Sequence, residues 1–199
     1  NFGVQIWVAR ELRFRVAESV VVSPRIMYIT GRAGADDRII QVVCAHAPTE
    51  VASDGDKDEF WHSLDLVIDK LTGELCFWLM DANARTSPTR GVIGPCDPAD
   101  GGTNDNGQRF IQRLAAADMV AANTFFPCGY TWRSPRGATA RIDYVCVKEA
   151  LLTAVKMCDV PDKVDLSLST KEDHRLVRAH VSISRGVKPE KKGCCSKVN

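Results

Sequence analysis

The sequence contains no long apolar run and no excess of one charge. Its longest strongly apolar stretches, such as residues 39–47 and 75–80, are far shorter than the roughly 18 residues that a membrane-spanning helix needs. Its 26 lysines and arginines nearly balance its 25 aspartates and glutamates, whereas a dedicated DNA-binding module has a strongly basic surface. We therefore expect no membrane span, and any nucleic acid must be held at a local site.

The sequence also lacks Cys-x-x-Cys pairs and the features of a signal peptide. Its eight cysteines lie mostly in apolar runs, which favours buried reduced thiols over disulfides or zinc ligands and predicts that Cys44, Cys76 and Cys146 are buried and unpaired. The chain begins at Asn1 instead of a methionine, and residues 1–9 have neither a basic start nor a long apolar run. We expect an intracellular protein with a truncated N-terminus.

What is present is the composition of an ordinary globular protein, with 199 residues of which 45% are apolar and 26% are charged. This length suits one domain, which we place at residues 1–185. Residues 186–199 carry lysine, glycine and cysteine without an apolar period and predict a flexible tail. Short β-branched runs between turn residues predict strands at residues 4–8, 20–22, 25–29, 39–46, 75–80, 119–122, 141–147 and 175–183.

Two segments have a helical period instead. Residues 54–71 place apolar side chains three or four positions apart, and residues 106–117 do the same after Asn104 or Asp105 as the expected N-cap. Predicted strands both follow one another directly and alternate with these helices. We therefore expect an α/β fold, a layered α/β sandwich with mixed β-sheets flanked by helices.

Aromatic and basic residues leave two interpretations open. Trp7, Trp61 and Trp78 follow the strand and helix patterns and are expected in the core, whereas Trp132 suits either core packing or contact with a substrate. Several arginines lie on predicted loops and form either a rim that contacts phosphate or a solvated face. They are Arg85, Arg90, Arg133, Arg136 and Arg141.

Polar residues at strand ends are the candidate site. The apolar run at residues 75–80 stops at Asp81 and Asn83, and a spacing of two points both side chains to the same side of the sheet edge. A plain turn explains the same two residues. Asp143 lies within an apolar strand, where a lone acid usually pairs with an arginine or a histidine.

A second polar group, Asp173 and His174, opens the last predicted strand, although an Asp-His pair is also a common loop feature. Together with the earlier residues it supplies the groups that phosphodiester hydrolysis needs. These are a base for water, an amide for phosphate, a carboxylate for a metal ion, and a histidine oriented by an acid.

Six short motifs follow one another in a fixed order. They are Ala45-His-Ala-Pro-Thr49, Met80-Asp-Ala-Asn-Ala84, Asn104-Asp-Asn-Gly-Gln108, Tyr130-Thr-Trp-Arg-Ser-Pro135, Arg141-Ile-Asp-Tyr144 and Glu172-Asp-His-Arg175. In that order they resemble the endonuclease/exonuclease/phosphatase family, above all the apurinic-type endonuclease domain of non-LTR retrotransposons, whose usual versions read YAPT, GDFNA, DNG, TWRS, IDYI and SDHR. The resemblance covers about residues 3–183 and implies a deoxyribonuclease I-like fold.

The resemblance also implies a role for each matching residue. Asp81 resembles the general base for the attacking water, Asn83 the phosphate-binding amide, and His174 the phosphate-facing histidine that Asp143 orients. Asp173 resembles a ligand of Mg²⁺, with Mn²⁺ as the alternative ion. The residues expected to contact substrate are His46, Thr49, Trp132 and Arg133.

Two departures from the family pattern affect the expected activity. The family has a metal-binding glutamate on a strand upstream of the segment matched by residues 3–8, and it has a tyrosine where this chain has His46. These departures predict a partial copy of the fold with poor metal affinity and weak or no DNA nicking by these 199 residues. Strong nicking would require another ligand, such as Asp97 or Asp100.

The function that the resemblance implies is a metal-dependent phosphodiesterase acting on DNA. It would be the nicking module of a retroelement polyprotein that also carries a reverse-transcriptase domain and works in the nucleus. Two alternatives stay open. One is a catalytically inactive remnant that binds nucleic acid weakly, and the other is a phosphoesterase acting on phosphoinositides or other lipids, since one scaffold serves several phosphoesters.

Overall fold

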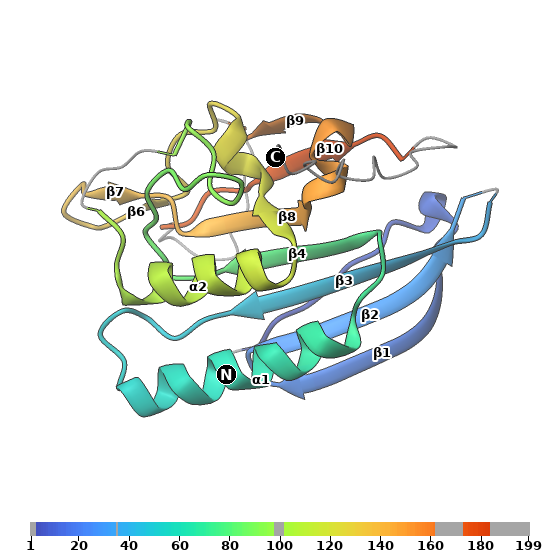
Figure 1. Ribbon diagram of the computed structural model, residues 1–199, viewed down its shortest axis with the longest axis horizontal. Coiled ribbons are helices and arrows are strands. Elements are labelled where there is room, and N and C mark those ends of the chain that lie inside the picture. The colour runs from blue at the N-terminus through green and yellow to red at the C-terminus, as the bar shows by residue number, and fades with distance from the viewer. Residues whose placement is uncertain (1–2, 35, 98–101, 162–172, 184–199) are drawn as a thin grey trace, which may run out of the picture.

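The computed structural model describes residues 3–34, 36–97, 102–161 and 173–183, and its main element is a six-stranded sheet (Figure 1). The strand order is β1-β2-β3-β4-β8-β5. The bounds are β1 (Arg15–Ser23), β2 (Ile26–Ala33), β3 (Arg38–His46), β4 (Cys76–Asp81), β8 (Asp143–Lys148) and β5 (Met119–Ala121). Neighbouring strands are antiparallel except β3 and β4, which are parallel, so the sheet is mixed as expected.

Two helices lie on the same face of this sheet (Figure 1). The helix α1 (Asp54–Lys70) is the crossover that the parallel strands β3 and β4 require, and α2 (Asp105–Ala116) leads into β5. The side chains of Ser53 and Asn104 each accept a hydrogen bond from a backbone N–H of the first turn, so Asn104 is the N-cap of α2.

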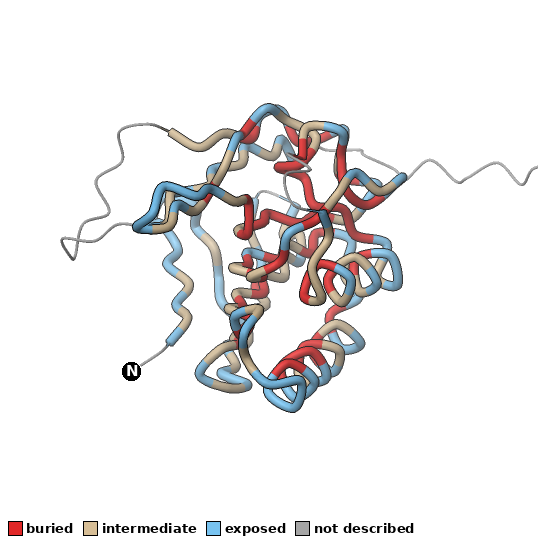
Figure 2. The backbone as a smooth tube through the Cα atoms, turned by 90° about the vertical axis from the view of Figure 1, so that its left-hand side faces the viewer, coloured by how far each residue is buried: buried red, intermediate tan, exposed pale blue. Residues whose placement is uncertain are grey.

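The core between the sheet and these helices is aromatic and aliphatic. Figure 2 shows the buried residues running through the middle of the molecule and along one side of the helices. The largest fully buried side chains are Trp61, Trp78, Tyr144, Phe110, Ile26, Leu64 and Leu114. The predicted burial of Trp61 and Trp78 is therefore confirmed.

A second layer covers part of the other face of the sheet. It consists of the 3-10 helix η3 (Glu149–Ala154) and an antiparallel pair, β9 (Val155–Asp159) and β10 (Arg178–Val181). Its core joins side chains of β8 and β5 to those of η3 and β9. Shorter elements are η1 (Arg10–Leu12), η2 (Ala122–Phe125), and the hairpin of β6 (Trp132–Arg133) and β7 (Thr139–Ala140). The layered α/β fold expected from the sequence is confirmed.

Several element predictions were wrong in detail. Residues 3–9 form no strand, because no described strand pairs with them, and Trp7 is 88% exposed instead of buried. The strand predicted at residues 20–22 is longer, since β1 starts at Arg15, and the one predicted at 175–183 is shorter. The strand β9 was not expected, because its residues Val155–Asp159 alternate only weakly between apolar and polar.

The described cysteines are free thiols, in agreement with the prediction. Cys76 and Cys146 are buried, but Cys44 is half-buried because it points to the sheet face opposite the helices, between the core residues Val43 and Ala45. The predicted tail at residues 186–199 lies outside the described residues and stays a prediction. Among the described residues, no helix has the length and apolarity needed to cross a membrane.

We predict that Leu64→Ala destabilises the fold strongly and that Leu66→Ala, on the same helix, does not. Leu64 is fully buried under the sheet, whereas Leu66 is 60% exposed. Deleting the buried side chain should lower the free energy of unfolding by about 2–5 kcal/mol, and deleting the exposed one should change it by less than about 0.5 kcal/mol. Urea unfolding followed by circular dichroism measures both. Equal losses would contradict this packing of α1.

Candidate active site

Three strands of the main sheet meet at residues that the sequence singled out. The strand β3 ends at His46, β4 ends at Asp81, and β8 begins at Asp143. The register pairs Asp81 with His46 on one side and with Asp143 on the other. Since Met80 and Tyr144 point into the helix-covered core, the two aspartates project from the opposite face of the sheet.

The segment with His174 reaches this sheet end by pairing with the hairpin strand β6. His174 forms an isolated bridge with Trp132, and the Arg133 N–H donates to the Asp173 carbonyl at 2.8 Å. This pairing places the His174 Nδ1 atom 3.1 and 3.2 Å from the two carboxylate oxygens of Asp143. The Nε2 atom lies 3.8 Å from Asp81 Oδ2, so the imidazole sits between two carboxylates.

The turn after β4 gives Asn83 a fixed orientation. Asn83 has a positive φ of 45°, which asparagine tolerates better than most residues, and its N–H donates to Asp81 Oδ1 at 3.0 Å. Its side-chain nitrogen donates to the carbonyl of Ala47 at 2.9 Å, and its carbonyl accepts from Asn104 at 3.2 Å. An amide nitrogen has two hydrogens, so one remains after the contact with Ala47.

Two residues that support this turn were missed by the sequence reasoning. The carboxylate of Glu50 accepts from the N–H groups of Asp105 and Asn106, at 3.1 and 3.3 Å, and so ties the loop after β3 to the start of α2. The buried Asn106 donates to the Pro48 carbonyl at 2.9 Å and accepts from the Trp61 indole. A buried asparagine within a motif was a usable signal, whereas no sequence pattern marks Glu50.

These side chains surround one pocket of about 550 Å³. The predicted residues that line it are Asp81, Asn83, Asp173, His174, His46, Thr49 and Trp132. Asp143 is held against this group by its contacts with His174. Arg133 is the exception, because it is absent from the lining and its guanidinium lies 5.3 Å from the centre of the Tyr130 ring.

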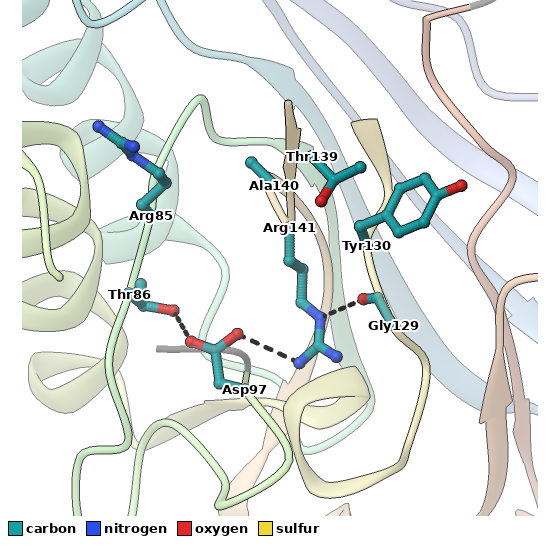
Figure 3. Close-up of a pocket in the computed structure, with 8 residues that line it drawn as sticks. All are labelled: Arg85, Thr86, Asp97, Gly129, Tyr130, Thr139, Ala140 and Arg141. Atoms are coloured by element: carbon teal, nitrogen blue, oxygen red, sulfur yellow. Dashed lines mark hydrogen bonds and ion pairs between the residues drawn. The ribbon is translucent and has the colours of Figure 1, made fainter. Parts of the chain in front are cut away.

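Arg141 is buried, contrary to both interpretations of its sequence position, a phosphate-contacting rim or a solvated face. In a smaller pocket next to the first (Figure 3), its Nη1 donates to Asp97 at 3.2 Å and its Nε donates to the Gly129 carbonyl at 3.0 Å. The hydroxyl of Thr86 donates to the other oxygen of Asp97. Asp97 is therefore committed to the fold and cannot act as the replacement metal ligand, while Asp100 lies outside the described residues.

The surroundings shift the pKa of three titratable groups of the site, Asp81, His174 and His46. Burial, with the charge of Asp143 added, raises the pKa of Asp81 to about 6. The hydrogen bond to Asp143 raises the pKa of His174 to about 9. Burial lowers the pKa of His46, whose Nε2 lies 3.4 Å from Asp81 Oδ2. At neutral pH the site therefore combines an ionised Asp81, a protonated His174 and a neutral His46.

The site has the oxygen donors that a hard divalent cation prefers. Ligand atoms of Asp81, Asp143 and His174 lie within 4.8 Å of one another, and the exposed Asp173 lines the same pocket. A protonated imidazole cannot bind a metal ion, so the aspartates are the fitting ligands. Carboxylate oxygens suit Mg²⁺ or Mn²⁺ and do not suit a thiolate-binding metal.

Solved structures share this architecture, although no protein-family model and no curated protein sequence matches the chain. The 3′ phosphatase NExo from Neisseria, bound to a product DNA hairpin, gives a TM-score of 0.61 at 20% sequence identity, over 85% of this chain and 72% of that chain. The endonuclease domain of TRAS1, a telomere-specific non-LTR retrotransposon, gives 0.61 at 15% identity, over 85% and 67%. An AP endonuclease from Archaeoglobus fulgidus gives 0.52 at 15% identity, over 78% and 65%.

The chain has the endonuclease/exonuclease/phosphatase fold. The six sequence motifs implied this deoxyribonuclease I-like fold, and the structural likeness confirms it. The similar structures with this fold include a phosphatase, an exonuclease and an endonuclease domain. Since one fold supports several activities, the activity of this chain has to be argued from its site.

We predict that Asp143→Asn lowers the pKa of His174 from about 9 toward the ordinary value of 6.5, because the hydrogen bond to a carboxylate is the main cause of the raised value. The folded pKa exceeds the unfolded one, so this pair stabilises the fold fully below pH 6.5 and the contribution is lost as pH rises through 9. NMR titration of the metal-free chain measures the pKa of His174 with and without the substitution, and the His174→Ala variant identifies the signals of this histidine. An unchanged pKa in the variant would contradict the geometry.

Proposed function

We propose that the chain belongs to the endonuclease/exonuclease/phosphatase family and is a metal-dependent phosphodiesterase that cleaves DNA. The observation that carries this proposal is the placement of His174 between Asp81 and Asp143 on the wall of one pocket. An ionised carboxylate and a protonated imidazole next to each other are the base and the positive charge that hydrolysis of a phosphodiester needs.

The proposed reaction is an attack of water on phosphorus. Asp81 takes a proton from the water as the oxygen bonds to phosphorus, which requires its carboxyl to be ionised, above a pKa of about 6. His174, protonated below a pKa of about 9, donates to a phosphoryl oxygen where negative charge grows. The remaining amide hydrogen of Asn83 donates to the same phosphate, and the departing sugar oxygen takes a proton from solvent.

Asp173 is the residue that would hold Mg²⁺ or Mn²⁺ in this proposal, because Asp81 acts as the base. Both oxygens of Asp143 face His174 Nδ1, which leaves few carboxylate oxygens for an ion and predicts weak binding. When bound, the ion would neutralise charge on the phosphate and on the departing oxygen. The residues that would contact the nucleotide are His46, Thr49 and Trp132 from the pocket lining, with Arg133 further out.

DNA is the proposed substrate, and a retroelement endonuclease is the proposed type. The order of the six motifs supports this choice, and so does the structural likeness to the TRAS1 endonuclease domain and to a phosphatase bound to a DNA hairpin. We propose that a reverse-transcriptase domain belongs to the same polyprotein and that the protein acts on nuclear DNA.

We predict slow nicking of supercoiled plasmid at millimolar Mn²⁺ or Mg²⁺, abolished by EDTA. Asp81→Asn and His174→Ala should each lower the rate by about 10²–10³-fold, since each removes a group that acts in the transition state. His180→Ala is the matched control, because His180 is an exposed histidine of β10 outside the pocket, and it should leave the rate unchanged.

Parallel assays identify the alternatives. Release of phosphate from an inositol phosphate, without plasmid nicking, would replace DNA by a phosphoinositide as the substrate. Wild-type nicking at the rate of Asp81→Asn would contradict the proposal and leave an inactive remnant of the fold.

A further inference from the structure

Two fully buried polar side chains hold the main chain of Asp143. The hydroxyl oxygen of Thr131 accepts hydrogen bonds from the N–H groups of Ile142 and Asp143, each at 3.1 Å. The side-chain nitrogen of Asn123 donates to the Asp143 carbonyl at 3.0 Å, and its oxygen accepts from the Val145 N–H at 3.2 Å. Both peptide groups of Asp143 are therefore bonded to side chains.

The sheet explains why side chains are needed at this place. On one side of β8, the Ala82 N–H donates to the Ile142 carbonyl at 2.9 Å, so the peptide groups of Asp143 point to the other side. On that side β5 ends at Ala121, opposite Cys146, and no described strand continues next to residues 143–145. For Asp143 and Val145, Thr131 and Asn123 supply the hydrogen bonds that a longer β5 would make.

Thr131 also holds the backbone of the segment with His174, the residue to which Asp143 is bonded. Its carbonyl accepts from the Arg175 N–H at 2.7 Å, and its own N–H donates to the Ala140 carbonyl at 3.0 Å. One buried residue thus contacts the strand with Asp143 through its hydroxyl and the segment with His174 through its backbone. Neither Thr131 nor Asn123 lines the pocket, so neither touches a substrate there.

We propose that Thr131 is the positioning residue of the Asp143–His174 pair, with Asn123 as its second support. Removal of the hydroxyl leaves two buried N–H groups without an acceptor, and they gain hydrogen bonds only if the start of β8 moves. Such a movement takes the Asp143 carboxylate away from His174 Nδ1, to which it is bonded at 3.1 Å. The effect on catalysis rests on the proposed function, whereas the positioning itself does not.

The test compares Thr131→Val, which keeps the shape and removes the acceptor, with Thr131→Ser, which keeps the acceptor. The readout is the downfield NMR signal of the His174 Nδ1 proton in its hydrogen bond to Asp143, assigned by its loss in Asp143→Asn. Thr124→Val is the matched control. Thr124 is equally buried, and its hydroxyl also makes two backbone hydrogen bonds, to Gly94 and Ala121, but it does not contact Asp143.

We expect the signal to disappear in Thr131→Val and to persist in Thr131→Ser and Thr124→Val, with the fold retained in all three by circular dichroism. An unchanged signal in folded Thr131→Val overturns the proposal, and so does an equal loss in Thr124→Val, which would indicate general loosening. If Thr131→Val does not fold, Asn123→Ala, which removes the contact at the Asp143 carbonyl, takes its place with the same two outcomes.

An activity measurement extends the test if the wild type cleaves DNA. Thr131→Val should then lower kcat by about 10–100-fold, the usual effect of losing a group that orients a ligand or catalytic residue, with KM unchanged. Thr131→Ser should restore most of the rate. If the wild type does not cleave DNA, the proposed function fails while the NMR result still decides the positioning role.

Discussion

The structure places two aspartates side by side across antiparallel strands, and a histidine between them makes this arrangement possible. Asp81 and Asp143 are directly opposite each other in the β4–β8 ladder, where like charges destabilise a sheet. His174 lies next to both carboxylates, with its Nδ1 atom 3.1 Å from Asp143 Oδ2 and its Nε2 atom 3.8 Å from Asp81 Oδ2. The protonated imidazole offsets the repulsion, and burial of Asp81 keeps its pKa higher than that of a solvated aspartate. The rest of the site depends on this group of three.

The surrounding fold supplies each member of the group from a different part of the chain. The apolar core under α1 and α2 fixes β4 and β8, and these strands place the aspartates on the face of the sheet opposite the helices. The hairpin strand β6 holds the backbone of His174 through the bridge to Trp132. The buried ion pair of Asp97 and Arg141 ties the loop between β4 and α2 to the residues that precede β8, in the pocket next to the site (Figure 3). Local pairing thus brings together residues that are far apart in sequence.

The sequence predicted the elements that have a clear period and the residues that have a chemical motif. The apolar run before Asp81 and the helical spacing of α1 led to the correct core, and the motifs named the residues that line the pocket. It could not predict the burial and the contacts of residues whose surroundings come from distant parts of the chain. Trp7 has a strand pattern without a described strand next to it, Arg141 pairs with an aspartate 44 positions away, and Thr131 acts through hydrogen bonds to backbone. Such contacts depend on tertiary pairing, which periodicity does not encode.

The measurement that tests this account most directly is the pH dependence of kcat for DNA cleavage. The proposed mechanism requires an ionised Asp81 and a protonated His174 in the same molecule, so we expect a bell-shaped profile that rises near pH 6 and falls near pH 9. Asp143→Asn should shift the falling limb to lower pH, because it removes the hydrogen bond that keeps His174 protonated. A profile without a falling limb, or one that this substitution does not move, would contradict the account.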